Sequence, residues 1–200
     1  MPNNITENKT PSGIICINKP SGMTSHDVVN RLRRLYNTKK VGHTGTLDPM
    51  ATGLLIVLVG NAVKASEYLM SGNKSYVAGL RLGMTSDTED ISGNITVCTE
   101  ALPKKEEVCS ACEKFVGNIM QVPPMYSAIK IGGKKLVDLA RNGETVEREP
   151  REVTVYSLKC ECVNEESGDY LLDVECSKGT YIRTLCADIG ASLYCGGLMS

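Results

Sequence analysis

The sequence Val41-Gly-His-Thr-Gly-Thr-Leu-Asp-Pro-Met-Ala-Thr-Gly53 runs directly into Leu54-Leu-Ile-Val-Leu-Val59. The first stretch holds too many Gly and Pro residues for a regular element, so we expect a polar loop there. The second stretch is an unbroken apolar run of strand length, which is typical of a strand buried on both faces. A polar loop is therefore expected to be attached directly to the core.

Two side chains of this loop could take part in chemistry, His43 and Asp48. The glycines around them would let the backbone approach a ligand closely. The stretch is thus a plausible active-site loop. Asp48 could equally well shape a turn before Pro49, as Asp-Pro pairs often do, and an isolated His43 is more often structural or a surface group. The residues alone leave both interpretations open.

Outward from this loop, the sequence favours short strands and scattered helices. Thr24 followed three places later by Asp27 is typical of a capping box, and Val28, Leu32, Leu35 and Tyr36 then repeat at helical spacing. Further helices are expected at about 62–70, 103–115, 134–142 and 182–193. Strands are expected at 14–17, 54–59, 75–82, 153–163 and 170–176, the last two as a hairpin. This mixture indicates an α+β fold rather than a doubly wound sheet.

The composition is that of an ordinary globular protein, with 200 residues, 42% hydrophobic and 22% charged. Residues 1–12 are polar and are expected to form a flexible tail without the features of a signal peptide. No apolar run reaches membrane-spanning length, so we expect a soluble, cytoplasmic protein. The net charge of −1 argues against a broad electrostatic grip on nucleic acid. Any RNA binding must therefore use local patches.

Nine cysteines are scattered through apolar stretches. Their odd number and positions favour small core residues in a reducing compartment. Cys109-Ser-Ala-Cys112 is the single CxxC motif, and a zinc site would need a second pair of ligands at suitable spacing. Packing on a helix is therefore the expected role of this pair.

Other motifs carry weaker signals. Gly42 and Gly45 are not followed by the Gly-Lys-Ser/Thr of a phosphate-binding loop. The acidic stretch Asp87-Thr-Glu-Asp90 lacks the spacing of a calcium loop, and a solvated loop is the better interpretation. Tyr76 could be a core residue or lie near the open end of its strand. Arg183 could simply be an exposed residue at a helix start.

The order of the motifs is more informative than any one of them. The motifs are Asn18-Lys-Pro-Ser-Gly22, the loop from Gly42 to Gly53, Lys74-Ser-Tyr76, Gln121-Val-Pro-Pro-Met-Tyr-Ser-Ala128 and Ser177-Lys-Gly-Thr-Tyr-Ile-Arg-Thr184. Together they resemble the TruB family of bacterial tRNA pseudouridine-55 synthases, over about residues 13–200. The aspartate loop is highly specific at this length. The resemblance therefore favours the functional interpretation of Asp48.

The resemblance implies a pseudouridine synthase fold, with a mixed, mostly antiparallel sheet flanked by helices and loops. It implies isomerisation of a uridine in the tRNA T-arm, without cofactor or metal, by a monomer whose residues 13–200 form the catalytic domain. Asp48 would be the catalytic carboxylate, Arg183 its partner, and Tyr76 the aromatic side chain that stacks on the base. His43 would assist in turning the base outward. Lys19, Tyr181 and Lys130 match motif positions near the site.

In one respect the sequence departs from the family pattern. Family members continue after Cys195-Gly-Gly-Leu-Met-Ser200 with a Leu-Arg strand and a C-terminal RNA-binding region, often a PUA domain. We therefore expect a catalytic domain without that region, which could turn over poorly. Basic clusters at 31–40 and 130–135 could contact phosphates, although a solvated face explains either one about as well.

Two other functions remain as alternatives. One is an RNA-binding or RNA-folding protein without catalysis, which the missing C-terminal region motivates. The other is a metal-dependent nucleotide hydrolase that would use His43, Asp48 and the acidic residues 87–90, although no ligand spacing supports it.

Overall fold

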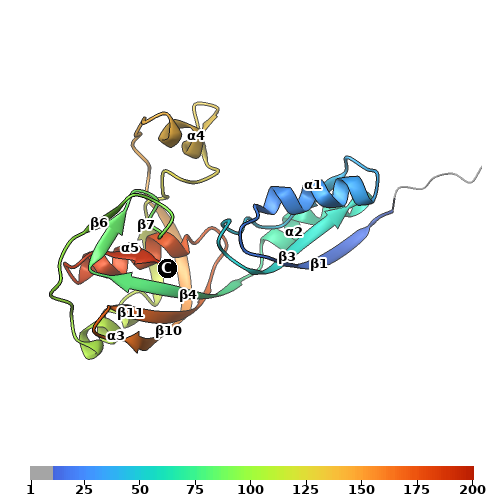
Figure 1. Cartoon of the computed structure of the whole chain (residues 1–200). Helices are drawn as coiled ribbons and strands as arrows, with labels where there is room; N and C mark the ends of the chain where they lie inside the picture. Colours follow the sequence, from blue (N-terminus) through green and yellow to red (C-terminus); the bar gives the residue numbers. More distant parts are fainter. Residues whose placement is uncertain (1–10) are drawn as a thin grey trace, which may run out of the picture. The chain divides into compact units, whose positions relative to one another are not determined.

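The computed structural model describes residues 11–200, so the first ten residues of the expected tail lie outside the described residues. The chain divides into two compact units, Met1–Gly72 and Asn73–Ser200, each with its own sheet and hydrophobic core (Figure 1). Among residues 11–200, no helix is both long and apolar enough to cross a membrane.

The first unit is a three-stranded antiparallel sheet with one long helix on it. The strand order is β1 (Gly13–Lys19), β3 (Gly53–Val59), β2 (Val41–His43), and the helix is α1 (Ser25–Leu35). Val28, Val29 and Leu32 of α1 pack on apolar side chains of the sheet. After β3 the chain forms a 3-10 helix, η1 (Gly60–Ala65), and a short α2 (Ser66–Met70), where the sequence predicts one helix.

The expected capping box is confirmed, because Thr24 and Asp27 bond each other's backbone and side chain at the start of α1. Two expectations in this unit are wrong. Val41–His43 forms a short strand instead of loop, because its backbone pairs with β3 between Val57 and Val59. Leu54 and Leu35 were expected to be buried, on a strand and a helix respectively. Leu54 is instead 64% exposed and Leu35 is 72% exposed, since each lies at the end of its element, away from the core.

The second unit is built on a five-stranded antiparallel sheet. Its strand order is β12 (Gly197–Met199), β4 (Lys74–Leu82), β11 (Asp169–Cys176), β10 (Arg151–Asn164), β7 (Gly117–Gln121). Helices α3 (Lys105–Glu113) and α5 (Ile182–Ser192) bury their apolar faces against it. The alternation of buried and exposed residues along β11 shows that one face of the sheet forms the core.

Three small features complete this unit. Strands β5 (Met84–Ser86) and β6 (Ile95–Val97) pair beside the sheet, and β8 (Lys130–Ile131) pairs with β9 (Lys134–Lys135) in a hairpin before α4 (Leu136–Arg141). Cys112 of the CxxC motif lies in the core cluster, as expected for a packing residue.

The α+β class and the antiparallel pairing are confirmed, and the hairpin predicted near the C-terminal end forms with Lys159 opposite Asp173. Strand β12 was not expected. It pairs with β4 because Gly197 lies against the backbone of Gly190 in α5, where a side chain would not fit. The sheet therefore gains a fifth strand through a contact that no local sequence pattern marks.

Gly190→Ala should lower the free energy of unfolding. Alanine favours a helix by about 1 kcal/mol over glycine, but the added Cβ would overlap the backbone of Gly196 and Gly197, and overpacking costs about 1–3 kcal/mol. Because the overlap is with backbone atoms, the cost lies at the upper end of this range, and urea unfolding should show a net loss of about 2 kcal/mol. Gly13→Ala is the control, because no atom lies within 4 Å of the position of its Cβ. Equal stability of the two variants would contradict the prediction.

Candidate active site

The loop that carries Asp48 is fixed to the first unit by hydrogen bonds on both sides of the aspartate. Ser25, at the start of α1, accepts a hydrogen bond from the Leu47 amide at 2.9 Å and donates one to its carbonyl at 3.2 Å. On the other side, the carbonyl of Pro49 accepts from the Gly22 amide at 2.9 Å. Asp48 therefore extends from a backbone that is held immediately before and immediately after it.

Lys19 is the central support of this loop. Its side chain is wholly buried, and its ammonium group donates to the carbonyls of Met23, Pro20 and Pro49 at 2.7, 3.0 and 3.2 Å. An ammonium group has three donors, so each one has an acceptor. Burial lowers the pKa of Lys19, and the nearby Asp48 carboxylate opposes that change. The structure therefore brings Lys19 and Asp48 together.

His43 lies at the end of β2, where the loop begins, with Val57 of β3 opposite it. Its Nδ1 is buried and, within residues 11–200, has no hydrogen-bond partner. Burial lowers the pKa of His43, so the neutral imidazole is favoured at pH 7. The start of the Asp48 loop therefore carries an uncharged ring.

In the second unit, Arg183 occupies the first turn of α5 and is only 6% exposed. Its guanidinium donates to the carbonyls of Thr88 and Tyr126 at 2.9 and 3.0 Å, and its Nε lies 3.8 Å from Oδ2 of Asp90. The alternative of an exposed helix-start residue is therefore wrong. Two loops distant in sequence cover the side chain and orient it.

The acidic stretch at 87–90 is solvated only in part. Asp87 is exposed and accepts hydrogen bonds from Asn94, whereas Asp90 is buried and accepts from Thr88 and from the Ser92 amide at 2.7 and 2.9 Å. The expectation of a solvated loop is wrong for Asp90, because this carboxylate faces the buried Arg183. Within residues 11–200, no three His, Cys, Asp or Glu side chains are grouped so as to hold a metal.

The two tyrosines lie on regular elements of the second unit. Tyr76 lies on β4 opposite Val174 and packs partly against the core cluster. Tyr181 is the N-cap residue of α5. Its backbone is held by Gln121, which accepts from the amide at 3.0 Å and donates to the carbonyl at 3.2 Å. Gln121 is almost wholly buried and begins one of the quoted motifs, but this role was not anticipated, because it depends on a residue 60 positions away.

Lys130 differs from the other candidates, since it lies exposed on the β8–β9 hairpin opposite Lys135. The structure thus gathers Lys19, His43 and Asp48 on one loop system of the first unit. It places Tyr181 and Arg183 together at the start of α5 in the second.

Glu89 and Asp188 form a pair of interacting acids whose coupling was not anticipated. Glu89 has a backbone φ of 62°, and its carboxylate accepts from the Thr184 hydroxyl at 2.6 Å. Burial raises the pKa of Glu89, and burial together with Glu89 raises the pKa of Asp188 to about 6. Asp188 therefore titrates at about pH 6, well above the usual range of an aspartate.

Comparison with known proteins gives a consistent result. A family model described as TruB family pseudouridylate synthase (N terminal domain) matches residues 33–182. tRNA pseudouridine synthase B of Alkaliphilus oremlandii is 52% identical over 189 residues, covering 94% of this chain and 62% of that protein. The protein of the same name from Clostridium kluyveri is 49% identical over 187 residues, covering 94% and 64%. The chain thus spans less than two thirds of the length of these curated relatives.

Solved structures agree with the sequence comparison. The Cbf5 complex with Nop10 and Gar1 matches with a TM-score of 0.71 at 30% identity, over 94% of this chain and 46% of that chain. The archaeal box H/ACA complex of Nop10 and Cbf5 matches with a TM-score of 0.67 at 27% identity, over 96% and 49%. These likenesses confirm the fold expected from the resemblance.

Lys19→Met should destabilise the protein by about 2–4 kcal/mol, because the carbonyls of Pro20, Met23 and Pro49 all lose the charged donor that the buried Lys19 supplies. Urea unfolding measures the loss. Lys159→Met is the control, since Lys159 is exposed and its replacement should change stability by less than about 0.5 kcal/mol. A Lys19 variant as stable as the control would contradict a supporting role for Lys19.

Asp188→Asn should flatten the pH dependence of stability. Between about pH 4 and pH 6 the folded protein holds a proton on Asp188 that the unfolded chain has released, so the free energy of unfolding falls as pH rises through this window. After allowance for solvent screening at this partly exposed side chain, Asp188 should lower the free energy of unfolding by about 1–2 kcal/mol across this window.

Urea unfolding of the wild type and the variant across that window measures the effect. Asp173→Asn is the control, because Asp173 lies on the exposed face of β11. A wild-type slope that survives unchanged in Asp188→Asn would show that Asp188 does not titrate there.

Proposed function

Because the chain belongs to the TruB family of pseudouridylate synthases, we propose that it isomerises a uridine in the T-loop of tRNA to pseudouridine. The named activity of the relatives supports this, since two of them are tRNA pseudouridine synthases B at about half identity. The single structural observation that carries the proposal is Asp48, held on a loop fixed by Lys19 and Ser25.

The reaction needs no electron transfer. The bond between ribose C1′ and uracil N1 breaks, the base turns, and C1′ joins C5, while the proton leaves C5 and a proton is gained at N1. Substrate and product are isomers, so we propose that neither a metal nor a cofactor takes part. The enzyme must instead hold a detached uracil and supply a carboxylate.

We assign the catalytic carboxylate to Asp48. It would act by attack on the base or the sugar, or by removal of a sugar proton. Lys19 supports this assignment as a positioning residue, because its ammonium group holds the carbonyl of Pro49, next to Asp48. A fixed carboxylate avoids reorganisation during the reaction.

Arg183 is the proposed partner of the Asp48 carboxylate. Its side chain is buried and its direction is set by the carbonyls of Thr88 and Tyr126. A guanidinium has five N–H donors, enough to bind a carboxylate in addition to these acceptors. Such pairing would fix the direction in which the carboxylate points.

Tyr76 is proposed to stack on the target base, because a strand residue with a half-buried ring offers a rigid aromatic face. His43 would help to hold the base turned outward, which costs a few kcal/mol of stacking. Tyr181 and Lys130 are proposed to contact substrate, Tyr181 from the start of α5 and Lys130 from its exposed hairpin. We further propose that the protein acts as a monomer in the cytoplasm.

Asp48→Asn should reduce isomerisation by more than about a thousandfold, because the amide keeps the shape but neither attacks nor accepts a proton. The measurement is tritium release from tRNA labelled at uridine C5, together with mass-spectrometric mapping of pseudouridine. Asp173→Asn, on the exposed face of β11, is the matched control and should keep wild-type activity. Activity that survives in Asp48→Asn would refute the assignment.

A further inference from the structure

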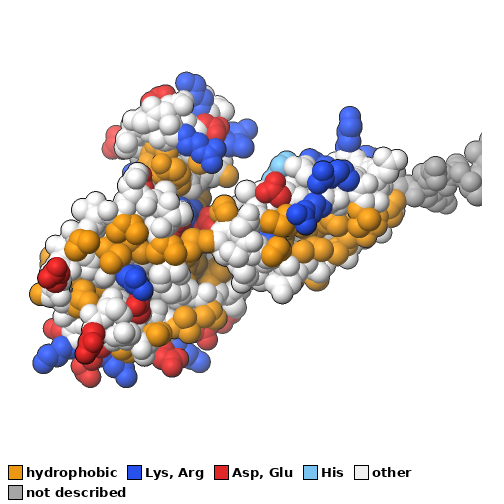
Figure 2. All heavy atoms as spheres, in the orientation of Figure 1, with side chains coloured by type: hydrophobic (Ala, Val, Ile, Leu, Met, Phe, Trp, Pro, Cys, Tyr) orange, Lys and Arg blue, Asp and Glu red, His pale blue; other side chains and the backbone are white. Residues whose placement is uncertain are grey.

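The two units carry opposite charge, which the net charge of −1 conceals. Residues 11–72 contain seven Lys and Arg residues and three Asp and Glu residues. Residues 73–200 contain fourteen Lys and Arg residues and nineteen Asp and Glu residues. The first unit therefore has a net charge of +4 and the second of −5. Figure 2 shows Lys and Arg side chains gathered over α1 in the first unit.

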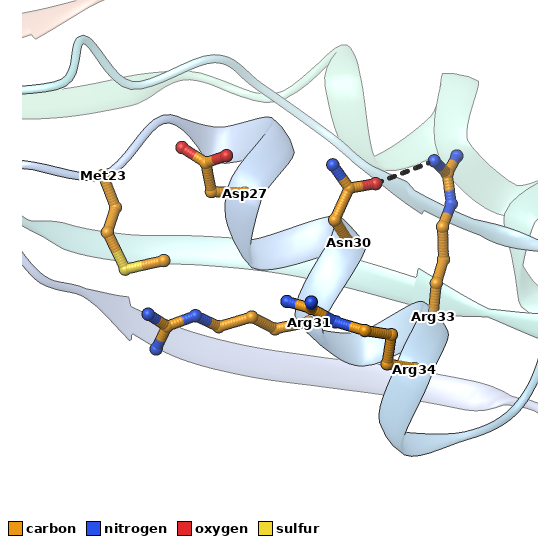
Figure 3. Close-up of a pocket in the computed structure, with 6 residues that line it drawn as sticks. All are labelled: Met23, Asp27, Asn30, Arg31, Arg33 and Arg34. Carbon is orange, nitrogen blue, oxygen red and sulfur yellow. Dashed lines mark hydrogen bonds between the residues drawn. The ribbon is translucent and has the colours of Figure 1, made fainter.

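An open groove of about 670 Å³ lies along α1 (Figure 3). Its lining residues are Met23, Asp27, Asn30, Arg31, Arg33 and Arg34. Arg31 and Arg34 extend along the same side of the helix, while Arg33 leaves it on another side, next to Asn30. Three guanidinium groups thus border one groove.

The third arginine and the single acid of this groove are already engaged. Arg33 donates to Oδ1 of Asn30 at 3.1 Å and to the carbonyl of Val41 at 3.4 Å. Asp27 accepts from the amide and hydroxyl of Thr24 in the capping box, and these hydrogen bonds lower its pKa. The Asp27 carboxylate is therefore engaged mainly by Thr24 at the start of the helix.

Arg31 and Arg34 are exposed, and within residues 11–200 no hydrogen bond or ion pair fixes either guanidinium. Basic residues in the last turn of a helix complement its dipole, which accounts for Arg33 and Arg34. Arg31 lies further from the helix end, four residues after Asp27, whose pKa it helps to lower. Like charges on one side of a helix cost a few tenths of a kcal/mol, and a bound anion would reverse that cost.

We propose that this groove binds the phosphodiester backbone of the RNA substrate through Arg31 and Arg34. Guanidinium groups bind phosphate oxygens with two parallel hydrogen bonds, and such contacts position a nucleic acid without reading its sequence. The proposal rests on the function proposed above, because it takes the partner to be tRNA. It also supplies the local patch that a chain with almost no net charge needs in order to bind RNA.

The test compares tRNA binding by wild type and by Arg31→Gln/Arg34→Gln over a range of salt concentrations. Each phosphate contact contributes about 0.7–0.9 to the slope of log affinity against log salt, so the double variant should lower that slope by about 1.5. Its affinity at low salt should fall about tenfold or more. Arg31→Lys/Arg34→Lys should keep most of the slope but lose affinity, since lysine keeps the charge without the paired donors.

The matched control is Lys114→Gln/Lys159→Gln, which removes the same charge from exposed positions of the second unit and should leave the slope unchanged. Thermal unfolding confirms that each variant folds. All binding is repeated in the Asp48→Asn background, so that binding is measured without reaction.

The outcomes separate the two proposals. If wild type does not bind tRNA, the proposed function fails. If wild type binds and isomerises tRNA but the α1 and control variants have equal slopes, the groove proposal alone fails. Binding of an oligoglutamate peptide that depends on Arg31 and Arg34, while tRNA binding does not, would also overturn it.

Discussion

The first unit depends on a positive charge that has no contact with water. The Lys19 ammonium lies at the end of β1, in a region where an uncompensated charge would cost several kcal/mol, and three backbone carbonyls compensate it. These carbonyls belong to the turn after β1 and to the Asp48 loop. One side chain therefore joins two segments about 30 residues apart and holds the backbone next to Asp48.

Much of the fold could be predicted from local pattern. The strand at 54–59, the capping box at Thr24 and the hairpin near the C-terminal end all have short-range signals, namely apolar runs, cap residues and turn residues. The pairing of Val41–His43 and of β12 could not be predicted in this way. Both strands are three residues long, and both form because they pair with the edge of a strand distant in sequence.

For the site, the motif order identified the candidate residues but not their surroundings. The residues alone left open that Arg183 is an exposed residue, and only the folded chain places Asp90 and two carbonyls around it. Gln121 holds Tyr181 through a contact between residues 60 positions apart, and its neighbours in sequence carry no sign of this. Helix and strand periodicity indicates only which face of an element is buried, so it could not indicate these contacts.

The strand β12 has a consequence for the order in which the chain can fold. It pairs with β4 across more than a hundred intervening residues, and contacts of such separation form slowly because the loop they close is long. The sheet of the first unit closes over much shorter loops. During synthesis the first unit could therefore be folded before β12 pairs with β4. Until then the unpaired edge of β4 could pair with other chains.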